Sequence, residues 1–288
     1  MLIQNILQNA FLSGTIEVFA AVSLQGVGVA TAIVAGVGLF IGLFLGFAAK
    51  TFEVKQDETE LLVRELLPGA NCGGCGYPGC DGLAAAIAKG EAPASACPVA
   101  NREAHLKIAE ILGTVIEETE RKVAYVKCMG TCDKTQVKYE YYGVRDCNKA
   151  AAVPGRGNKK CTYGCMGFGS CVRVCAFDAI HIIDGIAVVD KEKCTGCSTC
   201  TAQCPNELIE MVPAAARHLV GCSSLDKGKD VKAACSVGCI ACKLCEKACE
   251  FDAIHVNNNL AYIDYGKCTN CGKCAAVCPV KIIQVQSA

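Results

Sequence analysis

Aromatic residues are scarce in this 288-residue chain: tryptophan is absent, and Phe, Tyr and Trp together make up 6%. A large aromatic core is therefore not expected. Net charge is also lacking, because 28 Lys and Arg residues balance 28 Asp and Glu residues. A neutral chain offers no electrostatic footprint for nucleic acid, and a 52% hydrophobic composition is not that of a disordered tail. The length allows two or three domains.

The motifs of several enzyme classes are also missing. The sequence contains no P-loop, H-E-x-x-H zinc motif, C-x-x-C-H haem motif or Ser/His/Asp arrangement. Gly155 and Gly157 form a turn without the strand and helix of a dinucleotide fingerprint. The four histidines are scattered, and His181 and His255 occupy equivalent positions of an internal repeat, which favours packing. No substrate-converting site is predicted.

Charge is nearly absent from residues 1–49, where Glu17 is the single charged residue. Residues 26–49 are 24 uncharged, mostly apolar residues, which is long enough to cross a bilayer, and Lys50 ends the run. We predict one transmembrane helix over residues 26–49, with a cleaved leader as the alternative. Glycines at 38, 42 and 46 share a helix face and favour packing against other membrane subunits, although ordinary glycine content explains them too. Residues 1–25 are predicted to be an extension, either an amphipathic helix on the membrane or a non-native start.

What the chain has in excess is cysteine, with 25 residues. An odd number, a long chain and cysteines two or three residues apart argue against a secreted disulfide scaffold. Such spacing is typical of metal ligation, by zinc or by iron–sulfur clusters.

The first cysteine group follows the predicted anchor. Cys72, Cys75, Cys80 and Cys97 have the spacing C-x2-C-x4-C-x16-C, and intervening glycines let the backbone wrap a bulky ligand. Four thiolates suit one 4Fe–4S cluster, and zinc is the alternative from spacing alone.

Repeated cysteine runs make up the rest of the chain. Three runs have the bacterial ferredoxin spacing C-x2-C-x2-C-x3-C: Cys194, Cys197, Cys200, Cys204; Cys239, Cys242, Cys245, Cys249; and Cys268, Cys271, Cys274, Cys278. A fourth run is altered and carries Phe168 in place of a cysteine: Cys161, Cys165, Cys171, Cys175. Cys161–Cys175 aligns with Cys235–Cys249, and short β hairpins follow each copy. The pattern predicts two tandem dicluster ferredoxin modules.

In this fold the fourth cysteine of each run binds the cluster of the other run. Three regular sets are therefore predicted: Cys175, Cys194, Cys197, Cys200; Cys239, Cys242, Cys245, Cys278; and Cys249, Cys268, Cys271, Cys274. The remaining set has Cys165, Cys171 and Cys204, and Cys161 is the nearest substitute for Phe168.

Five cysteines remain: Cys128, Cys132, Cys147, Cys222 and Cys235. Cys128, Cys132 and Cys147 could supply a sixth cluster, with Cys161, Cys222 or Cys235 as fourth ligand. The alternative is that they are free buried thiols. We therefore predict five 4Fe–4S clusters with a sixth left open. Each cluster with four thiolates adds about −2, so five make the neutral chain acidic, at about −10.

The predicted fold class is α+β: a transmembrane helix, a small helical 4Fe–4S domain and two ferredoxin-like modules. The predicted boundaries are 1–25 for the extension, 26–49 for the helix, 50–120 for the small domain, 121–212 for the first module with its cysteine-containing insertion, and 213–288 for the second. Because labile iron clusters are assembled in the cytoplasm, we expect residues 51–288 on the cytoplasmic side of the inner membrane.

A glycine-rich apolar helix, the motif Asn-Cys-Gly-Gly-Cys-Gly-Tyr-Pro-Gly-Cys at 71–80 and the ferredoxin runs occur together. This combination resembles the B subunit of the Rnf complex, in its long cluster-rich form, over about residues 26–288. The N-terminal extension, Phe168, and Ala176 and Glu250 in place of prolines depart from the pattern.

The resemblance implies a component of a membrane ferredoxin:NAD⁺ oxidoreductase that couples electron flow to Na⁺ or H⁺ transport. It implies that the chain accepts electrons from reduced soluble ferredoxin and relays them to an NADH/flavin subunit and multi-helix membrane subunits. Two other functions are open to these residues: a membrane-tethered polyferredoxin adaptor without ion pumping, and a zinc-binding interaction module.

Overall fold

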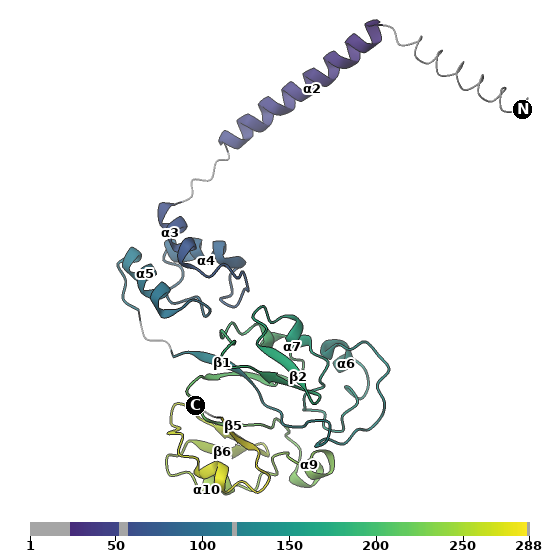
Figure 1. Cartoon of the computed structure of the whole chain (residues 1–288), viewed down its shortest axis with the longest axis vertical. Helices are drawn as coiled ribbons and strands as arrows, with labels where there is room; N and C mark the ends of the chain where they lie inside the picture. The colour runs from purple at the N-terminus through teal and green to yellow at the C-terminus, as the bar shows by residue number, and fades with distance from the viewer. Residues whose placement is uncertain (1–23, 52–56, 117–119, 287–288) are drawn as a thin grey trace, which may run out of the picture. The chain divides into compact units, whose positions relative to one another are not determined.

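The computed structural model describes residues 24–51, 57–116 and 120–286 (Figure 1). The chain divides into two compact units, residues 1–56 and 57–288, and each is described by itself. The predicted extension over residues 1–25 lies outside the described residues, except for its last two, which belong to the first described helix.

The described part of the first unit is one long helix, α2 (Leu24–Thr51). Residues Gly28–Lys50 form a 23-residue span within which the mean hydropathy reaches 2.4, so this helix is long and apolar enough to cross a membrane. A Cβ atom added at Gly38, Gly42 or Gly46 would meet no atom within 4 Å. The predicted apolar N-terminal helix is confirmed, and its membrane insertion remains a prediction.

The second unit begins with a small helical domain. Its three helices are α3 (Glu58–Leu66), α4 (Gly79–Ala88) and α5 (Arg102–Leu112). Asp57 and Asn101 cap α3 and α5 by accepting hydrogen bonds from backbone N–H groups, and Gly113 ends α5 with a left-handed φ of 65°. The cysteines Cys80 and Cys97 are buried in the apolar core of this domain beside Leu83, Ile87 and Ile108.

The first ferredoxin module contains two antiparallel strand pairs. Strand β1 (Lys122–Val126) pairs with β4 (Ile209–Pro213), and β2 (Ile180–Ile183) pairs with β3 (Ile186–Val189). The pairing places Val123 opposite Val212, and both side chains are buried. Three short helices complete the module: α6 (Cys147–Ala152), α7 (Ser170–Arg173) and α8 (Thr199–Ala202).

The second module repeats this plan. Strand β5 (His218–Val220) pairs with β8 (Ile283–Val285), and β6 (Ile254–Asn257) pairs with β7 (Leu260–Ile263). Its helices are α9 (Gly228–Ala234), α10 (Leu244–Lys247) and α11 (Lys273–Ala276). The β6–β7 turn has positive φ at Asn258 and Asn259, as a two-residue hairpin of type I′ requires. The helices and strand pairs confirm the predicted α+β class.

Three buried apolar clusters lie in the second unit. They span residues 63–109, 123–219 and 220–283. Cysteines make up a large share of these cores, and Tyr265 packs against the second and the third cluster. The two ferredoxin modules are thus in contact, and each is built around thiols in place of large aromatic side chains.

Candidate iron–sulfur sites

Five cavities in the ferredoxin modules are each lined by four cysteines. Three of them hold the regular sets that the crossover rule predicts: Cys175, Cys194, Cys197, Cys200; Cys239, Cys242, Cys245, Cys278; and Cys249, Cys268, Cys271, Cys274. In each set the fourth cysteine comes from the opposite run, because the two halves of a module fold back on each other.

The altered run differs from the sequence prediction. The thiols of Cys165, Cys171 and Cys204 line a cavity with Cys147, and Cys161 is not among its lining residues. We call these four cysteines the insertion site, because Cys147 comes from the segment inserted between β1 and the altered run. Phe168, which replaces a cysteine in the repeat, packs against Tyr141 of the same segment with ring centroids 5.1 Å apart.

Local polar contacts hold Cys147 in the insertion site. The Cys147 backbone N–H donates to Ser170 Oγ at 2.8 Å, and Ser170 Oγ donates to the Asp146 carboxylate at 3.0 Å. Asp146 also caps α6 by accepting from Lys149 N at 3.0 Å, and it forms an ion pair with Arg173. These contacts connect Cys147, the first residue of α6, with Ser170, the first residue of α7. Cys171 directly follows Ser170.

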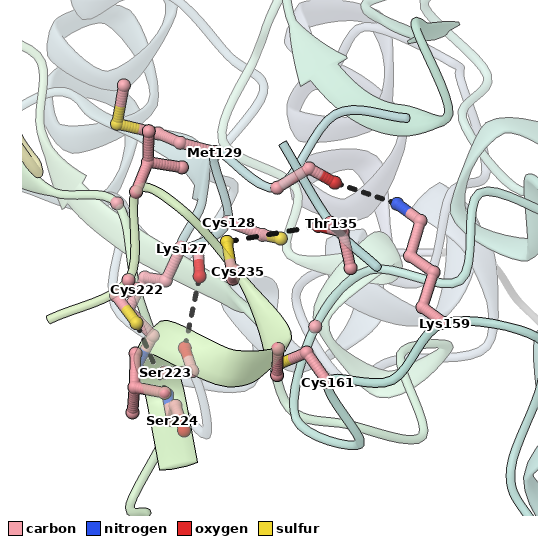
Figure 2. Close-up of a pocket in the computed structure, with 17 residues that line it drawn as sticks. Lys127, Cys128, Met129, Thr135, Lys159, Cys161, Cys222, Ser223, Ser224 and Cys235 are labelled. Atoms are coloured by element: carbon pink, nitrogen blue, oxygen red, sulfur yellow. Dashed lines mark hydrogen bonds between the residues drawn. The ribbon is translucent and has the colours of Figure 1, made fainter. Parts of the chain in front are cut away.

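The fifth cavity lies between the two modules and is lined by Cys128, Cys161, Cys222 and Cys235 (Figure 2). We call these four cysteines the interface site. Cys128 and Cys222 each follow a strand, β1 and β5, by two residues, and Cys235 ends α9. Neither Cys132 nor Cys147 lines this cavity, so the predicted grouping of Cys128, Cys132 and Cys147 does not assemble.

The sixth set lies in the small helical domain. Asn71 adopts a left-handed φ of 47°, and its side-chain oxygen accepts from Cys80 N at 2.8 Å. Gly79 also has positive φ, and a Cβ there would approach that oxygen at 3.1 Å. Burial raises the pKa of the Cys97 thiol, and nearby Cys75 and Cys80 raise it further. The set of Cys72, Cys75, Cys80 and Cys97 stays a prediction.

Backbone N–H groups donate to many of the thiols, and hydrogen bonds to the ligating sulfurs help to set the reduction potential of a cluster. The fourth cysteine of each run accepts from the N–H four residues later, at 3.4 Å: Cys175 from Ala179, Cys204 from Leu208, Cys249 from Ala253 and Cys278 from Ile282. At the interface site Cys128 accepts from Cys165 N at 3.3 Å and Cys222 from Cys239 N at 3.4 Å.

Burial keeps the cluster-free thiols neutral. It raises the pKa of Cys171 and of Cys200 to about 12, and of Cys222 and Cys245 to about 11. Neighbouring thiols contribute to this rise. Cluster ligation requires thiolates, so assembly at these sites must release protons.

The geometry suits a cluster better than a single ion. Among the described residues no three His, Cys, Asp or Glu side chains meet closely enough to hold one metal ion. Four cysteines around a void instead fit a ligand of several atoms, as a 4Fe–4S cube is.

Comparisons with known proteins bear on the same segments. A family model for an Fe–S cluster domain matches residues 67–99, a 4Fe–4S dicluster domain matches 238–282 and a 4Fe–4S binding domain matches 187–210. The B subunit of the Na⁺-translocating ferredoxin:NAD⁺ oxidoreductase complex of Acetobacterium woodii is 48% identical over 85% of this chain and 74% of its own length. The B subunit of the ion-translocating oxidoreductase complex of Methanosarcina acetivorans is 44% identical, over 88% of this chain and 97% of that relative.

A third relative has similar coverage. The B subunit of the proton-translocating ferredoxin:NAD⁺ oxidoreductase complex of Clostridium ljungdahlii is 39% identical over 86% of this chain and 88% of its own length. The chain belongs to the B-subunit family of these ion-translocating complexes. The resemblance to the Rnf B subunit is thereby confirmed.

The three matched domain models do not cover every cysteine. Sixteen lie inside the three matched domains and nine lie outside: Cys128, Cys132, Cys147, Cys161, Cys165, Cys171, Cys175, Cys222 and Cys235. Apart from Cys132 and Cys175, these cysteines line the insertion site and the interface site, together with Cys204. Structure is therefore the main guide to these two sites.

Sequence reasoning missed the residues that support the two irregular sites of this family member. Asp146 and Ser170 place Cys147, and Thr135 Oγ1 donates to Cys235 Sγ at 3.8 Å. One signal was available: Asp146 directly precedes Cys147 and has the character of a helix N-cap. A short capped helix that begins at a cysteine would have indicated that the fold fixes the position of Cys147.

Proposed function

We propose that the chain carries six 4Fe–4S clusters and relays electrons from reduced ferredoxin to partner subunits of a membrane-bound, ion-translocating ferredoxin:NAD⁺ oxidoreductase. The observation that carries this proposal is that five cavities are each lined by four cysteines; with the spacing of Cys72, Cys75, Cys80 and Cys97 as a sixth set, 24 of the 25 cysteines are assigned. The remaining cysteine is Cys132, whose side chain is exposed. Multiple clusters in one chain allow electron transfer over several short steps.

The cavities support a carrier and not a converting enzyme. All five described cavities of the ferredoxin modules are lined by four cysteines, and their remaining walls are mostly apolar or backbone. Clusters bound there would supply one-electron redox chemistry, and the protein would set their potentials by burial, charge and N–H···S hydrogen bonds. NADH and flavin sites are assigned to partner subunits.

The second module is the proposed entry point for electrons. Cys242 and Cys271 are exposed, in contrast to most of the cysteines. Lys243 follows Cys242 and Lys273 lies two residues after Cys271. Each lysine forms an ion pair, Lys243 with Glu246 and Lys273 with Glu250, so the proposed entry point rests on the exposed cluster ligands and not on a positive surface.

The helix α2 is the proposed membrane anchor. It would cross the membrane once, with residues 51–288 on the cytoplasmic side where ferredoxin is found. The small helical domain follows the anchor in sequence, so we assign its cluster to the exit end of the relay. Electrons would leave there toward membrane subunits and the NADH/flavin subunit.

One experiment tests the relay. The complex is isolated anaerobically through this chain, its subunits are identified, and cluster reduction by reduced ferredoxin is followed by absorbance and EPR. We expect about 24 Fe per chain, from four Fe in each of six clusters, and co-purification of multi-helix membrane subunits and an NADH-binding subunit. The variant Cys278→Ala should impair ferredoxin-dependent reduction of the other clusters.

Two results would contradict the proposal. Normal reduction kinetics in Cys278→Ala would remove the second module from the entry path. Recovery with a hydrogenase or formate enzyme, and without membrane-spanning partners, would favour the adaptor function instead. Reduction by dithionite in the same samples is the control that the clusters are present and redox-active.

A further inference from the structure

A buried lysine lies between the interface site and the insertion site. We propose that the Lys159 ammonium raises the reduction potentials of the clusters at these two sites. This inference rests on the proposed function, because it presupposes clusters at both sites. It assigns a role to a residue of this chain that the cysteine pattern does not explain.

Lys159 is held in place by hydrogen bonds. Its side chain is buried, with 8% of its surface exposed, and Nζ donates to the carbonyl oxygens of Gly130 and Gly185 at 2.8 Å each. Its backbone pairs with Val137 in an isolated β-bridge. The ammonium group therefore occupies one position and does not reach out to solvent, unlike most lysines.

The first carbonyl partner places the charge at the interface site. Lys159 lines the same cavity as the four cysteines of that site, and Figure 2 shows its bond to the backbone beside Cys128. Gly130 directly abuts the thiols, since a Cβ added there would lie 3.6 Å from both Cys128 Sγ and Cys235 Sγ. The ammonium is thus one peptide group away from two proposed ligands.

The second carbonyl partner connects the charge to the insertion site. Gly185 lies in the β2–β3 turn, and two residues later Ala187 N donates to Cys165 Sγ at 3.4 Å. The ammonium is therefore joined, through the β2–β3 turn, to the backbone group that donates to a ligand of the insertion site.

No carboxylate in the described part of the chain forms an ion pair with this lysine. Within those residues no Asp or Glu oxygen lies within 4.0 Å of Lys159 Nζ, although ion pairs occur at many other lysines. Reduction adds one electron to a cluster that is already anionic with its four thiolates. A fixed, unpaired positive charge in a region of low dielectric stabilises the reduced form more than the oxidised form.

The internal repeat provides a comparison within the chain. Cys161 aligns with Cys235, so the second-module counterpart of Lys159 is Ala233, which is exposed. If the ferredoxin fold itself required this lysine, both position 159 and position 233 would carry lysine. The charge is instead specific to the half that carries the altered run.

The test uses the full-length, anaerobically purified protein in three variants. Lys159→Gln and Lys159→Met remove the charge, and Lys159→Arg keeps it. Lys160→Met is the matched control, because Lys160 is the exposed neighbour and its loss changes the net charge equally. Iron is quantified in each, and midpoint potentials are measured by potentiometric titration with EPR and absorbance.

We expect the Gln and Met variants to keep their iron and to show lower midpoint potentials for two clusters, with the other four unchanged. The Arg and Lys160→Met variants should match the native protein. In a Lys159→Gln, Cys161→Ala double variant, which lacks the interface cluster, a single shifted cluster should remain.

Unchanged potentials in fully loaded Lys159→Gln protein would overturn the inference. Loss of iron from both neutral variants would also overturn it, because Lys159 would then be a structural tie between two loops. Failure of the proposed function looks different: the native protein itself would contain about 20 Fe or fewer, by four Fe per cluster, before any lysine is changed.

Discussion

The assignment of Cys147 and Cys161 to different clusters can be tested by combining cysteine substitutions. Six four-thiol sets predict about 24 Fe in the native chain, and loss of one cluster predicts about 20. Two substitutions in the same set remove the same cluster, so the double variant should still have about 20 Fe. Two substitutions in different sets should leave about 16.

The structure places Cys147 with Cys171 in the insertion site and Cys161 in the interface site. Cys147→Ala combined with Cys171→Ala should therefore retain about 20 Fe, and Cys161→Ala combined with Cys171→Ala about 16. With Cys161 as the substitute for Phe168, the pattern read from the sequence predicts the reverse order where Cys147 belongs to a sixth cluster, and about 16 Fe for both double variants where only five clusters form. Iron and sulfide are quantified on anaerobic protein, and EPR identifies the cluster that is lost.

The matched control is Cys132→Ala. Cys132 is exposed and lines neither cavity, so this variant should keep the native iron content. A Cys147/Cys171 double variant with about 16 Fe would refute the insertion site. A loss of about four Fe in Cys132→Ala would refute the interface site, because it would make Cys132 a ligand.

Three further predictions follow from the contacts around the sites. Asp146→Ala removes the cap of α6 and a contact that places Cys147, so it should cost about 0.5–2 kcal/mol in urea unfolding and speed cluster loss in air; an unchanged rate would contradict the placement argument. Leu219→Ala empties a fully buried position and should cost about 2–5 kcal/mol in the same assay, whereas Leu225→Ala, at an exposed position, should be nearly neutral. Burial raises the pKa of Cys222 to about 11 and of Cys171 to about 12. The contribution of these neutral thiols to the stability of the cluster-free chain is therefore fully present below the ordinary thiol pKa of about 8.5, and it is lost as the pH rises through the raised values. Circular dichroism of chelated protein should show this loss, and a flat profile across that range would contradict it.

The fold was accessible from the sequence because its determinants are local and repeated. The spacing of Cys194, Cys197 and Cys200 leaves few alternatives to a ferredoxin loop, and the hairpins after each run recur at matching positions. The long apolar run of α2 and the regular cluster sets follow from the same kind of pattern. These features depend on residues close together in sequence or on a fold with a fixed crossover rule.

The irregular sites were not accessible because their partners are chosen by tertiary contacts. Cys147 lies 18 residues before Cys165, in an insertion without a repeat counterpart, and its position depends on Ser170 and Asp146. Proximity in sequence favoured Cys161, four residues before Cys165. Closeness in sequence does not decide which cavity a thiol lines. The backbone between the two cysteines turns, so that the Cys161 thiol lines the interface site and not the insertion site.

The interface site has an internal two-fold pattern that explains why the leftover cysteines divide as they do. Cys161 and Cys235 are equivalent in the repeat, and Cys128 and Cys222 each follow the first strand of their module by two residues. Their contacts match as well. Cys128 accepts from the N–H of Cys165, and Cys222 accepts from the N–H of Cys239, which is the repeat counterpart of Cys165. Each module thus contributes two equivalent thiols to one shared site.

This pattern distinguishes cysteines that have a counterpart in the other module from Cys132, which has none. Four residues after Cys222 the counterpart of Cys132 is Asp226, so Cys132 has no equivalent thiol in the second module. Phe168 and Cys147 break the pattern together, since the loss of a cysteine from the run is compensated by one from the insertion. A cluster at the interface site would tie the two modules to each other. Removing Cys128 or Cys222 should therefore loosen their packing equally, measured by hydrogen exchange at β1 and β5, and an effect confined to the mutated module would contradict the shared site.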